Sequence, residues 1–154
     1  GGIAGHAGLF ATAGDVAAFG AAGLEGEPRL GIEPAVRGEA LREQAADAAD
    51  RRGLGWQLPR PLPDPERPPA ADPDAGDPAE PAGLDRLGPG AFGHTGFTGT
   101  ALSVDPDAGR VVACLTNRVW AGRATPGVGT LMARIHALAA EAAADPSAPP
   151  GPTR

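Results

Sequence analysis

The sequence predicts an α+β fold in which an antiparallel β-hairpin is covered by a helix near the C-terminus. Residues 93–104 carry Thr, Phe, Leu and Val side chains that suit a pleated strand, and residues 111–115 form the unbroken apolar run of a strand covered on both faces. Between them, the segment 105–109 (Asp-Pro-Asp-Ala-Gly) places proline and glycine where a tight turn needs them. Further on, apolar residues recur at spacings of three and four, which is typical of an amphipathic helix: Val128, Leu131, Ile135, Leu138 and Ala142.

A first helix is expected close to the start of the chain. Thr12 is placed to cap it, and Asp15 three residues later completes a capping box and suits the positive end of the helix dipole. Phe19 is expected on the inward face of this helix. Because glycine weakens a helix, Gly20 and Gly23 are expected to mark its end.

Weaker patterns predict the remaining elements. An Ala-rich stretch over residues 33–49 is expected to be a second helix, and residues 52–58 a short strand. The C-terminal helix should begin after a cap and a proline at Thr125 and Pro126, lie on one face of the sheet, and end near Asp145.

Composition excludes several classes of function. The net charge of −6 falls largely in residues 59–90, which are rich in Pro, Asp, Ala and Gly and predict a disordered insertion, and residues 145–154 predict a disordered tail. No basic stripe is present, which argues against nucleic acid, and no apolar run reaches the length of a membrane span. The single cysteine excludes an internal disulfide and leaves the localisation undecided.

A small polar cluster, His94-Thr95-Gly96, opens the predicted hairpin. It resembles the third active-site motif of the serine β-lactamase and penicillin-binding-protein superfamily, a Lys-Thr-Gly or His-Thr-Gly sequence on a sheet strand. The longer run 94–100 (His-Thr-Gly-Phe-Thr-Gly-Thr), with Val-Asp-Pro and Leu-Thr-Asn-Arg after it, is similar to the class C-related serine hydrolases of that superfamily. The runs 5–13 (Gly-His-Ala-Gly-Leu-Phe-Ala-Thr-Ala) and 53–56 (Gly-Leu-Gly-Trp) resemble the same family.

This resemblance implies a partial β-lactamase/transpeptidase-like fold. Residues 1–144 would form the C-terminal part of the domain: the antiparallel sheet, its covering helix and part of the helical region. The chain has no initiator methionine and opens within a glycine-rich loop, so we expect a fragment.

The resemblance also implies roles for individual residues. His94 would lie in the wall of the cleft beside the general base, and Thr95 would offer its hydroxyl to the substrate. Gly96 would keep the strand open for close approach, and the backbone N–H of Phe97 would be one of two oxyanion donors. Arg123 and Asn117 are the candidate substrate-binding residues, with Arg123 placed to hold a carboxylate.

The parent reaction would be acyl transfer to a serine, followed by hydrolysis of an ester, amide or lactam, with no cofactor and no metal. The sequence contains no lysine and no tyrosine, and neither Ser103 nor Ser147 has a lysine three residues on. The Ser-x-x-Lys and Tyr-x-Asn motifs are therefore expected in a missing N-terminal half of the same domain. We expect the chain alone to be inactive and its partner to be a small molecule or peptide with an acyl carbonyl.

Simpler interpretations remain open at this point. His94-Thr95-Gly96 could be an ordinary exposed start of a strand, or the chain could be a non-catalytic module that binds peptide or cell-wall fragments. Cys114 and Trp56 are expected to be core residues and His136 to be half-exposed beside the apolar stripe.

Overall fold

The computed structural model describes residues 8–25, 30–46, 51–60, 83–122 and 127–144. Within these residues the protein has one six-stranded sheet in which each strand pairs with the next strand of the chain, in the order β1 to β6. All five pairings are antiparallel. The strands are β1 (Ala45–Ala46), β2 (Arg51–Arg52), β3 (Gln57–Leu58), β4 (Phe92–Thr95), β5 (Ala101–Asp105) and β6 (Arg110–Cys114).

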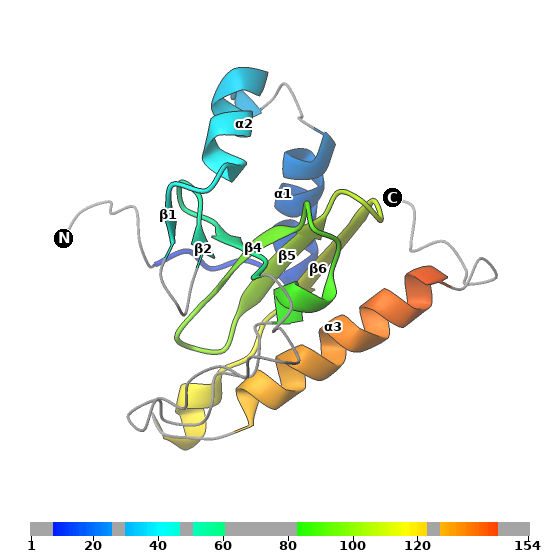
Figure 1. Ribbon diagram of the computed structural model, residues 1–154. Coiled ribbons are helices and arrows are strands. Elements are labelled where there is room, and N and C mark those ends of the chain that lie inside the picture. The colour runs from blue at the N-terminus through cyan, green and yellow to red at the C-terminus, as the bar shows by residue number, and fades with distance from the viewer. Residues whose placement is uncertain (1–7, 26–29, 47–50, 61–82, 123–126, 145–154) are drawn as a thin grey trace.

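Helices cover both faces of the sheet (Figure 1). Helix α1 (Ala13–Glu25) packs on β5 and β6, whereas α3 (Val128–Ala144) packs on β6 and on the short 3-10 helix η2 (Gly83–Arg86). Side chains alternate between the two faces of a strand, so neighbouring residues of β5 meet different helices. Leu102 lies against α1 and Ser103 contacts α3, which confirms the α+β fold and the helix expected on one face.

The capping box predicted at the start of α1 is confirmed. The Thr12 amide donates to Asp15 Oδ2 at 3.1 Å, and the Asp15 amide donates back to Thr12 Oγ1 at 3.2 Å. Two amides of the first turn, which have no partner within a helix, thereby gain acceptors.

The prediction that Gly20 marks the end of this helix is wrong, whereas Gly23 lies in its last turn. Helix α1 continues through Gly20 and Gly23 to Glu25, and Gly20 is buried against the sheet. A Cβ atom at Gly20 would lie 2.6 Å from Val111 Cγ1 and 2.9 Å from Leu102 Cδ1. Glycine is therefore required here because the helix backbone approaches β5 and β6 closely.

An aromatic cluster joins α1 to the core. Leu58, Phe92 and Val104 form the buried core, with Trp56 packed against it as expected. The Trp56 ring stacks on Phe19 at 6.5 Å and meets Phe92 edge-on at 5.0 Å between centroids. Phe19 is nevertheless 50% exposed, because the glycine face of α1, and not the Phe19 face, lies on the sheet.

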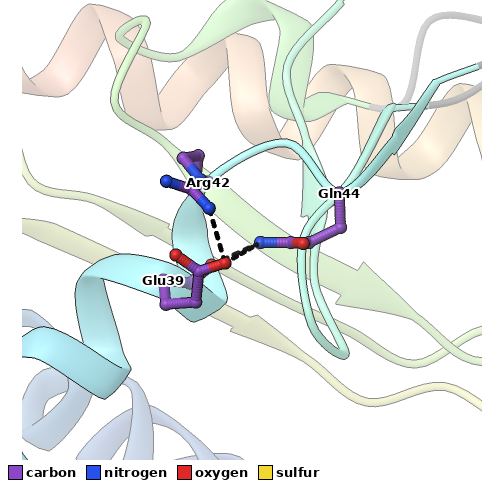
Figure 2. A network of polar contacts seen from close by, with 3 residues as sticks. All are labelled: Glu39, Arg42 and Gln44. Carbon is purple, nitrogen blue, oxygen red and sulfur yellow. Dashed lines mark hydrogen bonds and ion pairs between the residues drawn. The ribbon is translucent and has the colours of Figure 1, made fainter.

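The predicted second helix is shorter than expected. Helix α2 (Pro34–Leu41) ends eight residues before Ala49, and the chain then enters β1. Figure 2 shows the contacts at this junction: Glu39 Oε1 accepts from Arg42 Nη2 at 2.7 Å and from Gln44 Nε2 at 2.8 Å. The Arg42 amide also bonds to the Glu39 carbonyl, so the last turn of α2 closes on itself and directs the chain into the sheet.

The strand predicted over residues 52–58 is instead a tight hairpin. Strands β2 and β3 pair with each other, and the Gly53 amide bonds to the Trp56 carbonyl at 2.9 Å across the turn. Gly55 takes a positive φ of 76°, a conformation that glycine adopts without the steric penalty of a side chain. The Gly-Leu-Gly-Trp run therefore forms a turn.

The predicted first arm of the main hairpin, residues 93–104, also divides into two strands. Strand β4 ends at Thr95, a turn occupies residues 96–100, and β5 pairs back along β4 with His94 opposite Leu102. The second turn, residues 105–109, is confirmed: Asp105 pairs with Arg110 and Gly109 has a φ of 59°. Strand β4, which carries His94 and Thr95, therefore follows β3 and precedes β5 in the sheet, and Gly96 lies in the turn.

Helix α3 is confirmed, but its buried face differs from the predicted stripe. Leu131 and Leu138 are 44% and 56% exposed, whereas Met132 and His136 are 7% and 2% exposed. The expectation of a half-exposed His136 is thus wrong, because the helix turns this residue toward β5 and η2. The predicted cap at residues 125–126 lies outside the described residues.

Part of the expected disordered insertion is ordered. Of residues 59–90 the structure describes 59–60 and 83–90, and Leu84 of η2 is buried at 4% exposure beneath α3. Arg60 and Asp85 join the two described ends: the Arg60 amide donates to Asp85 Oδ1 at 2.7 Å, and the Arg60 Nε donates to Oδ2 at 3.0 Å. Residues 61–82 and the tail 145–154 lie outside the described residues. Cys114 is half-buried at the end of β6.

None of the helices described is long and apolar enough to cross a membrane.

Candidate functional site

A groove of about 350 Å³ lies at the end of β4, bounded by η2 and by the first turns of α3. Strand β3 pairs with β4 only at Gly93, so beyond Gly93 no described strand pairs with that edge of β4. A strand edge of this kind presents backbone donors and acceptors to the groove. Its lining includes His94, Thr95, Gly96, Phe97, Gln57 and Arg118.

The His94 imidazole is exposed and is held by two hydrogen bonds. Its Nδ1 lies 2.7 Å from the Thr95 carbonyl oxygen, and its Nε2 lies 3.2 Å from Nη1 of Arg52 on β2. Strand β2, which is separated from β4 by β3, therefore places the Arg52 guanidinium in direct contact with the His94 imidazole.

Gln57 fills the open edge of β4 beside Thr95. The Thr95 amide donates to Gln57 Oε1 at 3.1 Å, and the Thr95 hydroxyl lies 3.4 Å from the same oxygen. The Gln57 side chain thus occupies the place of a backbone carbonyl on a further strand, and it takes up both donors that Thr95 offers to the groove.

Gly96 begins the tight turn between β4 and β5. Its amide donates to the Thr100 carbonyl at 2.7 Å, and its carbonyl accepts from the Gly99 amide at 2.9 Å. A Cβ atom on Gly96 would collide with Thr100 Oγ1. A larger residue here would therefore force the Thr100 side chain or the turn to shift.

Phe97 and Arg118 form the rim of the groove. The Arg118 guanidinium carbon lies 4.9 Å from the centroid of the Phe97 ring, a cation–π contact, while the Phe97 side chain remains 59% exposed. Arg118 Nε is buried and has no hydrogen-bond partner within the described residues. Among the described residues, Arg118 lines the groove and no Asp or Glu side chain does. The fixed charge of the lining is therefore positive.

A buried Ser–His pair forms the floor of the groove. Ser103 Oγ and His136 Nε2 are 2.7 Å apart, and His136 Nδ1 is 2.7 Å from the carbonyl oxygen of Met132 one turn earlier in α3. Since a carbonyl can only accept, Nδ1 carries the proton and the Ser103 hydroxyl donates to Nε2. Ser103 and His136 are only 5% and 2% exposed, so the pair joins β5 to α3 as a satisfied buried contact.

The structure brings four of the six predicted site residues together, because His94, Thr95, Gly96 and Phe97 all line the groove. Asn117 is exposed at the start of the 3-10 helix η3 (Arg118–Ala121), is not among the lining residues and makes no side-chain capping bond. Arg123 lies outside the described residues.

Sequence reasoning missed the partners of the motif. Arg52 and Gln57 are far from the motif in sequence, and they face each other across β2 and β3 in a hairpin that the sequence did not predict. Arg118 stands directly after Asn117, so the Leu-Thr-Asn-Arg run could have pointed to it. Within the described part of the chain, no three His, Cys, Asp or Glu side chains gather as metal ligands.

Comparison with known protein families agrees with this architecture. The family model named Beta-lactamase matches residues 1–135, from before α1 to the middle of α3. The chain belongs to the Beta-lactamase family. No curated protein and no solved structure matches it. Membership of the Beta-lactamase family relates the chain to hydrolases, and the matched region contains all the strands of the described residues, including the groove edge of β4.

Proposed function

We propose that the chain forms one wall of the acyl-binding cleft of a serine hydrolase that cleaves an ester, amide or lactam. The observation that carries the proposal is the convergence of the third-motif residues 94–97 on one groove at an open strand edge, in a chain of the Beta-lactamase family. An acyl compound lying in this groove would meet backbone donors, a hydroxyl and fixed positive charge.

Each motif residue has a role in this proposal. The Thr95 hydroxyl would exchange its contact with Gln57 for one with the substrate, and Gly96 would allow the acyl chain to approach the backbone. The Phe97 N–H would donate to the oxyanion, and loss of one such donor typically costs about 3–4 kcal/mol of transition-state stabilisation. His94 would border the cleft beside the proton acceptor.

The nucleophile would belong to a segment that this sequence does not contain. The sequence has no lysine and no tyrosine, so neither Ser-x-x-Lys nor Tyr-x-Asn can be formed from it. Ser103 is not a substitute, because its hydroxyl is buried and donates to His136. The chain alone would therefore bind an acyl compound without turning it over.

Substrate carboxylates would be held at the Phe97 rim. We retain Asn117 and Arg123 as candidate ligands for such a group. Arg118 is the stronger candidate, since its side chain already lines the groove. A planar guanidinium can hold a carboxylate through two parallel hydrogen bonds.

A second candidate function is a non-catalytic module that binds peptide or cell-wall fragments. The wall of a cleft can be kept in a relative that has lost the chemistry, so a groove lined by residues 94–97 also fits a binding role, and the motifs outside this sequence discriminate the two functions.

The two functions are separated by reconstitution. The chain is mixed with a polypeptide of the same parent protein that carries the remaining motifs, and hydrolysis of nitrocefin and of p-nitrophenyl esters is followed. If the parent protein is a serine hydrolase, the mixture should hydrolyse at least one of these substrates, and the rate should fall when the chain carries Thr95→Val. Binding of the acyl compound without turnover in any mixture would support the binding module instead.

A further inference from the structure

The contact between Arg52 and His94 has a consequence for the chemistry of the groove. The two residues belong to β2 and β4, which are not neighbours in the sheet, and the Arg52 Nη1 reaches across β3 to the His94 Nε2 at 3.2 Å. The backbone that presents Arg52 is fixed on both sides, because the Arg52 carbonyl accepts from the Gln44 amide and Arg52 pairs with Gln57.

The two partners of His94 leave only one arrangement of its ring proton. A guanidinium has no acceptor, so Nε2 must accept from Arg52 with its lone pair. A carbonyl oxygen has no donor, so Nδ1 must donate its proton to the Thr95 carbonyl. Both bonds are satisfied together only by a neutral imidazole with its proton on Nδ1.

We infer that Arg52 is a positioning residue that holds His94 as the neutral Nδ1–H tautomer and places a positive charge directly behind the His94 ring. In this state both ring nitrogens of His94 are engaged: Nδ1 already carries a proton, and the lone pair of Nε2 accepts from a guanidinium N–H. His94 is then not a general base. The guanidinium remains charged throughout the range in which proteins are folded, so the wall keeps its cation when the histidine is neutral.

The tautomer follows from the contacts of this chain alone, whereas its meaning for catalysis rests on the proposed serine hydrolase function. For a substrate, the consequence is a fixed cation behind His94, since Arg52 contacts the His94 ring and is not itself among the residues that line the groove. An ester, amide or lactam that carries an anionic group near its carbonyl would be favoured over a neutral one.

The test is the ¹⁵N spectrum of the histidine rings of the chain at mildly alkaline pH, where histidine side chains are normally neutral. The protonated and unprotonated ring nitrogens differ widely in ¹⁵N shift, and a His94→Asn sample identifies the His94 signals among those of the three histidines. We expect the Nδ1–H tautomer to dominate. An Nε2–H pattern for His94 would overturn the inference without any variant.

Three variants of β2 separate positioning from a merely structural role. Arg52→Met keeps the length of the side chain but removes the donor, and it should lower the ratio of Nδ1–H to Nε2–H by roughly tenfold, the equivalent of one charge-assisted hydrogen bond. Arg52→Lys keeps a charged donor and should restore most of that ratio. Arg51→Met is the control, because it removes the same charge from the same strand at a residue that bonds to Glu43 and to the Pro59 carbonyl. This variant should leave the ratio of the two His94 tautomers unchanged.

Each outcome is decisive for the role of Arg52. An unchanged ratio in Arg52→Met, an equal fall in Arg51→Met, or no recovery in Arg52→Lys would overturn it. Because the spectra are recorded without substrate, a failure here would leave the serine hydrolase proposal standing, and a failed hydrolysis assay would leave the tautomer standing.

Discussion

Replacing Ser103 by alanine tests the buried contact beneath the groove. The change removes the hydroxyl that donates to His136 Nε2 at 2.7 Å, while the other ring nitrogen keeps its bond to the Met132 carbonyl. His136 is only 2% exposed, so its Nε2 would be left as a buried acceptor without a donor. An unsatisfied buried polar atom costs about 1–3 kcal/mol, and we expect Ser103→Ala to lower the free energy of unfolding by about 2 kcal/mol.

A double-mutant cycle with His136→Leu separates the hydrogen bond from the loss of packing. Removing both partners leaves no buried polar atom unsatisfied, so the double variant should lose less stability than the sum of the single variants, by about 1–2 kcal/mol. Urea unfolding followed by tryptophan fluorescence measures each variant, and Thr130→Ala, at an exposed position of α3, is the matched control for loss of a hydroxyl. Additive single effects, or a loss below about 0.5 kcal/mol for Ser103→Ala, would refute the reasoning.

Three further substitutions test contacts elsewhere in the fold. Gly20→Val should destabilise the protein by about 1–3 kcal/mol in urea unfolding, because its Cβ would lie 2.6 Å from Val111 Cγ1, and a neutral effect would show that α1 does not lie on β6. Thr12→Ala should cost about 1 kcal/mol by thermal melting through loss of the capping box, whereas an unchanged melt would mean that the cap is not formed in solution. Asp85→Asn should weaken the partly buried ion pair with Arg60 by about 1–2 kcal/mol and speed amide exchange in η2, and unaltered exchange would count against that contact.

Local patterns predicted the parts of the fold that depend on neighbours in sequence. The Thr12 and Asp15 capping box, the turn at residues 105–109 and the end of α3 near Asp145 follow from propensity and from hydrogen bonds within a few residues, and the structure confirms them. The third-motif resemblance likewise placed four residues that share one groove.

Contacts between distant segments decided what the sequence could not predict. Gly20 suggested the end of a helix, yet its lack of a side chain lets α1 pack closely against Val111 of β6. The polarity of His136 suggested partial exposure, yet Ser103 and a backbone carbonyl satisfy both of its nitrogens in the interior. Glycines also misled the strand assignments, because those at 96 and 99 form a turn that divides the predicted strand in two.

The partners of the site residues were beyond prediction for the same reason. Arg52 reaches His94 across 42 residues of sequence, and Gln57 reaches Thr95 across 38. Only the pairing of β2, β3 and β4 brings them together, and that pairing rests on a hairpin that appeared in the sequence as a single short strand.

The central claim, that the edge of β4 is an acyl-binding wall, is tested most directly by mapping where an acyl peptide binds. The ¹⁵N-labelled chain is titrated with N-acetyl-D-alanyl-D-alanine, and the amide shifts are compared with those of a Gly96→Val variant, in which the Thr100 side chain or the turn must shift because the added Cβ collides with Thr100 Oγ1. The account predicts the largest changes at the amides of residues 95–97 and at the Gln57 side chain, and their loss in the variant. Changes confined to the aromatic cluster of Phe19 and Trp56, or equal changes in both proteins, would contradict it.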